Sequence, residues 1–133
     1  MTPALSPAEL DYLRGQRLGR LATVDGDGAP QNNPVGFAID DAGRILVGGL
    51  DLVATRKFRN VRRNANVAFV VDDLASVDPW LVRGVEVRGH AEALDDVDPP
   101  MPGMSRAVIR ITPRWIASWG LESDAMAIRG RGD

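Results

Sequence analysis

Apolar and polar residues alternate most clearly between Val82 and Leu94. Two sets of residues alternate there. The apolar set is Val85, Val87, Gly89, Ala91 and Ala93, and the polar set is Glu86, Arg88, His90 and Glu92. Side chains of successive strand residues point to opposite faces, so this pattern predicts a long strand with one solvated face. The glycine within the apolar set allows a bend or bulge in that strand.

Five further segments are rich in strand-forming residues and are bounded by glycine, proline, asparagine or aspartate. They span residues 18–24, 32–40, 44–50, 67–71 and 107–112, and residues 114–120, beyond Pro113, can extend the last one. The stretch 95–105 holds three prolines and is therefore expected to be a loop.

Two segments carry helical signals instead. Ser6 is a good cap residue and is followed by Pro7, and the spacing of the next leucines predicts a short helix that ends at Gly15. Thr55 can cap a second short helix over 55–64, in which Phe58 and Val61 fall on one face.

Six strands, one interrupting helix and short antiparallel connections indicate a mainly β fold with short helices. We expect a six-stranded antiparallel β-barrel, closed or split, rather than a doubly wound sheet, because no βαβ rhythm is present. Residues 1–133 are expected to form one domain. Residues 1–17 are its N-terminal helix region, and residues 121–133 are expected to be a flexible tail with a frayed end.

Composition removes several function classes. The 133 residues include no cysteine and one histidine, which excludes thiolate chemistry and clusters of imidazole metal ligands, so no metal site is expected. The formal net charge is −2, which argues against a globally basic nucleic-acid binder. No secretory start or long apolar run occurs, so we expect a soluble cytoplasmic protein without a membrane partner.

The second helix is basic although the chain as a whole is acidic. Arg56 and Lys57 stand in its first turn, where cations oppose the positive end of the helix dipole unless an anion binds there. Free amides, the Thr55 hydroxyl and these two cations can together form a phosphate cradle. A solvated basic face or a salt bridge in a dimer explains the same residues.

Other candidates have ordinary structural explanations beside the functional ones. Asn33 and Pro34 can present a strand edge to a flat heterocycle or can simply belong to an edge strand. Gly48 and Gly49 allow close approach of a ligand or mark a bulge. His90 lacks a nucleophile motif around it and is interpreted as a surface residue.

The order of the motifs resembles a known group of proteins. Four runs carry the resemblance: LGRLATVDGDGAPQNNPVGFAID, ILVGGL followed by TRKFRNVRRNANVAFVVDD, VRGVEVRGHAEAL, and RITPRWIASWG. They resemble the pyridoxamine phosphate oxidase-like superfamily of flavin-binding split barrels, and most of all its actinobacterial branch that uses the deazaflavin coenzyme F420. The C-terminal arginine-leucine-proline ending of oxidases acting on vitamin B6 phosphates is absent, so that activity is not expected.

The resemblance implies a homodimer with two cofactor sites between the subunits, and hydride transfer between F420 and an unsaturated small organic substrate. FMN is the alternative cofactor, and an FMN reductase or oxidase or a non-catalytic flavin carrier is the alternative function. No catalytic side chain is assigned, because the cofactor carries the hydride. The implied cofactor-binding residues are Arg20, Leu21, Ala22, Thr23, Asn33, Pro34, Val35, Gly36, Thr55, Arg56, Lys57 and Asn60, with Trp80 and Arg83 from the partner subunit.

Overall fold

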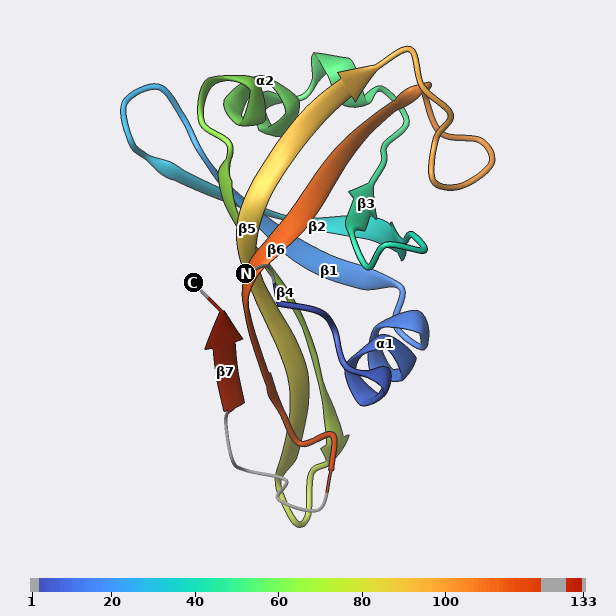
Figure 1. The fold of residues 1–133 in the computed structure, drawn as a ribbon, viewed down its shortest axis with the longest axis vertical. Coiled ribbons are helices and arrows are strands. Elements are labelled where there is room, and N and C mark those ends of the chain that lie inside the picture. Colours follow the sequence, from blue (N-terminus) through green and yellow to red (C-terminus); the bar gives the residue numbers. More distant parts are fainter. Residues whose placement is uncertain (1–2, 123–128, 133) are drawn as a thin grey trace.

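The computed structural model describes residues 3–122 and 129–132 of the chain, and they form a mainly β fold (Figure 1). Two α-helices, one short 3-10 helix and seven strands follow one another along the chain. In order they are α1 (Pro7–Arg14), β1 (Leu18–Val24), β2 (Pro30–Ile39), β3 (Ile45–Val47), η1 (Leu52–Ala54), α2 (Arg56–Arg63), β4 (Asn66–Ser76), β5 (Leu81–Asp95), β6 (Ala107–Trp119) and β7 (Arg129–Gly132).

The strands form one antiparallel sheet that closes on itself. Its order is β3-β2-β1-β4-β5-β6-β7, and β3 also pairs with β6. The first six strands in this order therefore make a closed barrel, which confirms the predicted six-stranded split barrel. The β3–β6 closure is short, since only Ile45–Val47 of β3 takes part in it.

The long alternating strand is confirmed as β5. Val85 and Val87 are fully buried, whereas Arg88 on the opposite face is exposed. The predicted irregularity is also present, because the β5–β6 register shifts between Arg88 and Gly89. A Cβ on Gly89 would lie 2.2 Å from the carbonyl oxygen of Thr112, so only glycine fits this close approach of two strands.

Several strand boundaries differ from the predicted ones. β4 continues to Ser76 instead of ending at residue 71, and β6 runs through Pro113 as far as Trp119. β3 ends at Val47, before the predicted residue 50. The frayed end predicted for the tail is wrong for Arg129–Gly132, which forms β7 and pairs with β6 from Ser118 to Trp115.

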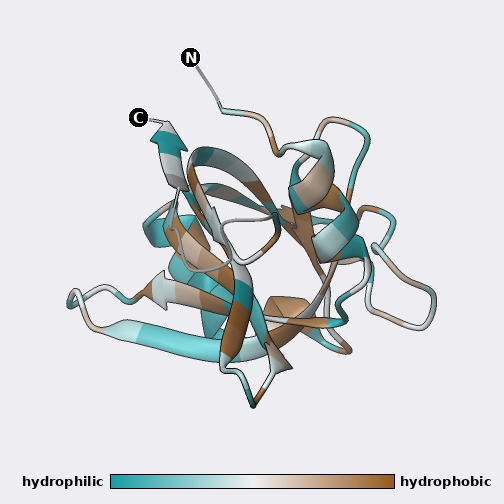
Figure 2. Cartoon of the chain, turned by 90° about the horizontal axis from the view of Figure 1, so that it is seen from below, coloured by the Kyte–Doolittle hydropathy of each residue, from teal (hydrophilic) through white to brown (hydrophobic). Residues whose placement is uncertain are grey.

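Inward-facing side chains fill the barrel. Phe37 and Phe69 meet edge to face, with their ring centroids 5.1 Å apart. Phe58 on α2 and Leu13 on α1 are fully buried, so both helices are held to the barrel by apolar contacts. Burying one such side chain contributes about 2 kcal/mol. Figure 2 shows brown, hydrophobic segments on several strands of the barrel beside teal, hydrophilic ones.

Segments near both ends of the described chain are tied to α1. Ser6 and Glu9 form a capping box, in which each side chain bonds to the backbone N–H of the other residue. The Glu9 carboxylate also accepts two hydrogen bonds from the Arg131 guanidinium, at 2.5 and 3.0 Å. Arg131 thereby fastens β7 to the first helix.

Candidate functional site

The basic helix α2 begins at Arg56 and is capped by Thr55, as predicted. The Thr55 Oγ1 accepts a hydrogen bond from the Phe58 N–H and donates its own proton to the Leu52 carbonyl oxygen at 2.6 Å. The hydroxyl proton is therefore engaged inside the protein. Thr55 positions the helix start, and the backbone N–H groups of Arg56 and Lys57 are left without intrahelical acceptors.

The first turn of α2 holds no acidic residue. Within the part of the chain that the structure describes, neither Arg56 nor Lys57 forms an ion pair. Arg59 donates to the Ala54 carbonyl oxygen, and the Arg62 guanidinium lies over the Phe58 ring. These contacts account for Arg59 and Arg62. Arg56, Lys57 and two backbone N–H groups of the first turn remain as a group of hydrogen-bond donors that fits a phosphate.

A hollow of about 270 Å³ lies between α2 and the β1–β2 turn. Arg56 and Arg63 line it on one side and Asp25 on the other. The backbone N–H groups of Ala29 and Asp27 lower the pKa of the Asp25 carboxyl, and the two arginines lower it further. Asp25 therefore balances part of the Arg56 charge, whereas Lys57 lies outside this hollow.

Beneath α2, three amide side chains are joined in a row that we call the amide ladder: Asn60, Gln31 and Asn33. Asn60 is 4% exposed, and its Nδ2 donates to the Thr23 Oγ1 at 3.0 Å and to the Gln31 Oε1 at 3.1 Å. Gln31 in turn donates to the Asn33 Oδ1 at 2.6 Å. The ladder links α2 to β1 and β2, and both amide hydrogens of Asn60 are used in it.

Asn60 was expected to hold the cofactor phosphate, which stays a prediction; in the structure its amide nitrogen joins the helix to the barrel. We predict that Asn60→Ala lowers the free energy of unfolding by about 2 kcal/mol, because the buried Thr23 hydroxyl loses its donor. Urea unfolding followed by tryptophan fluorescence measures the effect. Asn64→Ala, at the C-terminal end of the same helix, is the matched control. Equal stability of the two variants would contradict a structural role for the ladder.

The outer face of β1 and β2 carries a second set of predicted residues. Arg20 pairs with Asp72 on β4 at 2.5 Å, and Pro34 is exposed beside it. Together with Gln16 and Arg17, these residues line a hollow of about 410 Å³. Arg20 is thus held by a carboxylate and lies on the wall of an open surface depression.

Two apolar residues of the predicted set point into the core. Leu21 is 1% exposed and Val35 is 6% exposed, because both occupy inward positions of their strands. Contact with a cofactor from either residue can therefore come only through its backbone. Gly36 lies on the outer face, where the ends of Met101 and Met104 cover it.

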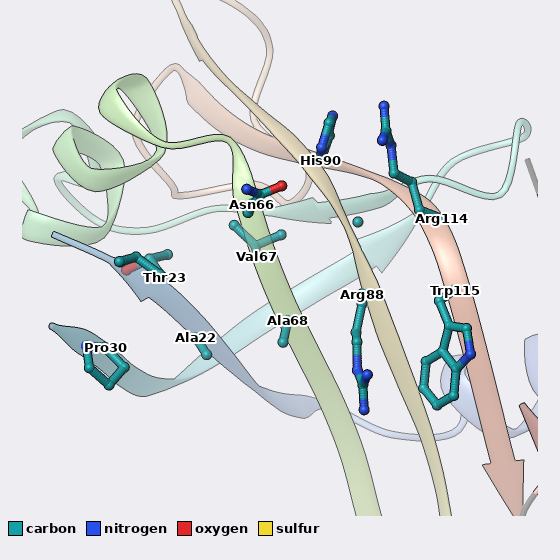
Figure 3. A pocket seen from close by; sticks show the side chains of 12 residues that line it. Ala22, Thr23, Pro30, Asn66, Val67, Ala68, Arg88, His90, Arg114 and Trp115 are labelled. Carbon is teal, nitrogen blue, oxygen red and sulfur yellow. The ribbon is translucent and has the colours of Figure 1, made fainter. Parts of the chain in front are cut away.

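A hollow of about 450 Å³ lies on the outer face of β1, β4, β5 and β6 (Figure 3). Ala22 and Ala68 form its floor, and Figure 3 shows the side chains of Arg88 and Trp115 side by side on neighbouring strands. The Arg88 guanidinium lies 4.2 Å from the centre of the Trp115 ring and also pairs with Glu86 at 2.9 Å. A cation on an aromatic plane suits a flat anionic group.

The β4–β5 turn lies at the other end of the molecule from α2 (Figure 1); Trp80 belongs to this turn and Arg83 to the start of β5. Arg83 makes two hydrogen bonds to the Asp73 carboxylate, which also accepts the Tyr12 hydroxyl. Burial raises the pKa of Tyr12, and the neighbouring Asp73 carboxylate raises it further. Trp80 is 59% exposed. Neither residue reaches the α2 end within one chain.

The predicted residues therefore fall into three groups. One surrounds α2 and the amide ladder, one lies on the outer face of β1 and β2, and one lies at the β4–β5 end, while Leu21 and Val35 face the core. The ladder residue Gln31 and the stacked pair of Arg88 and Trp115 were missed. A polar residue at an inward position of β2 was the signal for Gln31, and no comparable signal marks the pair.

Two further features concern only residues 3–122 and 129–132. No three side chains of histidine, cysteine, aspartate or glutamate gather there as metal ligands would. None of the described helices is long and apolar enough to cross a membrane.

Comparison with known proteins adds a family and relatives. The family model described as pyridoxamine 5'-phosphate oxidase matches residues 5–120. A curated protein of Streptomyces rimosus is 48% identical over 123 residues, which cover 87% of this chain and 83% of the relative. It is named 5a,11a-dehydrotetracycline/5a,11a-dehydrooxytetracycline reductase.

Solved structures agree in fold. A conserved hypothetical protein of Mycobacterium tuberculosis is 25% identical with a TM-score of 0.73, covering 98% of this chain and 94% of that one. An F420 reductase is 28% identical with a TM-score of 0.58, covering 75% of this chain and 88% of that one. The chain therefore belongs to the pyridoxamine 5'-phosphate oxidase family, and it is an oxidoreductase.

Proposed function

We propose that this protein is a cytoplasmic, F420-dependent reductase that adds hydride to a ring double bond of a flat, fused-ring organic compound. The observation that carries the proposal is the first turn of α2. Neither Arg56 nor Lys57 forms an ion pair with a described residue, and two backbone N–H groups of this turn have no intrahelical acceptor. The names of two similar proteins support it: one is an F420 reductase and the other reduces 5a,11a-dehydrotetracycline.

In this proposal the cofactor phosphate binds at the first turn of α2. Lys57 supplies a point charge, Arg56 supplies a second cation, and the two backbone N–H groups complete the donors. Reduced F420, when bound, supplies the hydride. The amide ladder keeps α2 in a fixed position relative to β2, so that the phosphate site and the segment Asn33–Gly36 stay at a constant separation.

We also propose that the working unit is a homodimer. Leu74, Val77 and Trp80 are exposed apolar residues on β4 and in the β4–β5 turn. Their contact with a second copy would remove this apolar surface from water. In this proposal the contact also brings Trp80 and Arg83 to the partner's site, because the β4–β5 turn lies at the opposite end of its own chain from α2 (Figure 1).

Two measurements test the proposed function. Fluorescence titration of the cofactor-free protein with F420 and, separately, with FMN identifies the cofactor. Reoxidation of reduced F420 in the presence of 5a,11a-dehydrotetracycline then tests turnover. Tight F420 binding and acceptor-dependent reoxidation are expected. Preference for FMN would make the protein an FMN reductase, and binding without reoxidation over a panel of fused-ring acceptors would make it a cofactor carrier.

A further inference from the structure

The hollow on the outer face of β1, β4, β5 and β6 has a floor of small side chains (Figure 3). A row of paired residues crosses the four strands beneath it: Ala22 on β1, Ala68 on β4, Arg88 on β5 and Trp115 on β6. Paired residues of neighbouring strands stand side by side on one face, so the two alanines leave a depression next to two large side chains. The volume of about 450 Å³ lies in the range of small-molecule sites, about 300–1,000 Å³.

The Arg88 guanidinium is held in a fixed place beside this floor. Its Nε donates to the Glu86 Oε2 at 2.9 Å, and its central carbon lies 4.2 Å from the centre of the Trp115 ring. Within residues 3–122 and 129–132, no group accepts a hydrogen bond from its two terminal nitrogens. Arg88 therefore presents unpaired N–H donors in the fork geometry that matches a carboxylate.

Trp115 is held in turn by the C-terminal strand β7. A Cβ on Gly130 would lie 2.5 Å from the Trp115 Cζ2, so the indole ring packs against the bare backbone of β7. The backbone of Trp115 also pairs with Gly132 of the same strand. Strands β5, β6 and β7 thus support the stacked pair together. The guanidinium is placed before any ligand binds, which lowers the entropic cost of binding one.

The charge of the lining is opposite in sign to that of the chain. Arg88, Arg114 and His90 line the hollow, and its described lining includes no aspartate or glutamate. Glu86 lies beside the hollow and balances part of the Arg88 charge. The chain as a whole carries a formal net charge of −2. A local excess of positive charge in a concave surface attracts anions.

We propose that this hollow is a binding site for a planar ring compound that carries a carboxylate. The ring lies over the floor of Ala22 and Ala68, and the carboxylate accepts hydrogen bonds from the two terminal nitrogens of Arg88. Asn66 and His90 pair with each other across β4 and β5 and also line the hollow, so they are available to a polar substituent of the ring. The inference stands apart from the proposed function, because it uses no residue of α2 and no cofactor position.

Three probes separate the contribution of the charge from that of the ring. 2-Naphthoate has both, 2-naphthamide keeps the flat ring without the charge, and cyclohexanecarboxylate keeps the charge without a flat ring. The full chain is labelled with nitrogen-15 at its three tryptophans, and Trp115→Phe identifies the Trp115 indole signal in NMR spectra. We expect 2-naphthoate to shift this signal and to bind at least about 10-fold more tightly than either control probe. No shift, or equal affinity for all three probes, overturns the inference.

Matched variants test the fork and the floor. Arg88→Leu keeps an apolar side chain without the donors and is expected to weaken 2-naphthoate binding about 10-fold or more. Arg110→Leu is the control, because Arg110 also pairs with a glutamate across β5 and β6, Glu92 at 2.9 Å, but does not line the hollow. Ala68→Leu fills the floor and is expected to abolish binding, whereas Ala68→Ser is expected to preserve it. Equal weakening by the two arginine variants would mean that the probe responds only to overall charge, and it would overturn the site.

Lys57→Ala distinguishes this site from the start of α2. The variant is expected to bind 2-naphthoate as the wild-type protein does, because Lys57 does not line the hollow. Loss of binding in Lys57→Ala would place the probe at the basic helix and would overturn the inference. Failure of F420 to bind contradicts the proposed function alone, since the 2-naphthoate titration is made without F420.

Discussion

Replacing Lys57 by alanine is expected to weaken F420 binding by about 10- to 100-fold, the range for losing a charge-assisted hydrogen bond. The ammonium group has no ion-pair partner among the described residues, so its removal costs the fold little. In the proposed complex, this substitution removes one of the cations that bind the anion beside the two backbone N–H groups at the start of α2. Fluorescence titration of the cofactor-free variant measures the loss.

Two companion variants make this result specific. Lys57→Arg keeps the charge and is expected to retain most of the affinity, whereas Arg14→Ala removes a cation from the end of α1 and is expected to change nothing. Added salt should weaken binding to the wild-type protein more than to Lys57→Ala. Unchanged affinity in both Lys57→Ala and Arg56→Ala would show that the basic helix is a solvated face.

Local periodicity explains why most elements could be predicted. The alternation over β5 follows directly from one buried and one solvated face, and Gly89 marks its bulge. Ser6 and Thr55 cap the two helices because their side-chain oxygens accept backbone N–H groups nearby. Each of these features depends on residues only a few positions apart, so it can be recognised in the sequence alone.

Features set by distant pairing could not be predicted. Pro113 lies inside β6, although a central proline normally argues against a strand. It pairs with Gly89 at the point where the β5–β6 register shifts, so its missing N–H falls where the ladder is already irregular. β7 was missed for a similar reason, since its four residues form a strand only along the edge of β6.

In the candidate site, too, local patterns could be predicted and the effects of distant pairing could not. The family resemblance assigns consecutive residues such as Leu21 and Ala22 to one cofactor site. In a strand, however, the Leu21 side chain points into the core and the Ala22 side chain points outward. The alternation of β2 did hold information that was overlooked. Gln31 and Asn33 stand in register with the buried Val35, and polar residues on a core-facing row need partners, which the amide ladder supplies.

The second large effect is expected at Arg131. Its guanidinium makes two hydrogen bonds to the Glu9 carboxylate, which is 2% exposed, and a third to the Ala4 carbonyl oxygen. Arg131→Ala leaves that carboxylate buried without its cation. Because Arg131 itself is partly exposed, we expect a loss at the low end for a buried pair, about 3 kcal/mol at pH 7.

The pH dependence of this loss distinguishes the ion pair from mere packing. Burial raises the pKa of Glu9, but hydrogen bonds from Arg131 and from the Ser6 N–H outweigh it, so the pKa lies below its ordinary value of 4.5. The pair therefore stabilises the fold above about pH 4.5, and this contribution disappears as the pH falls through the lowered native pKa. Urea unfolding of wild type and Arg131→Ala from pH 7 to pH 3 should show two stability curves that converge in acid. Curves that stay parallel would mean that Arg131 acts through its apolar stem, and that the charge on Glu9 does not hold β7 to α1.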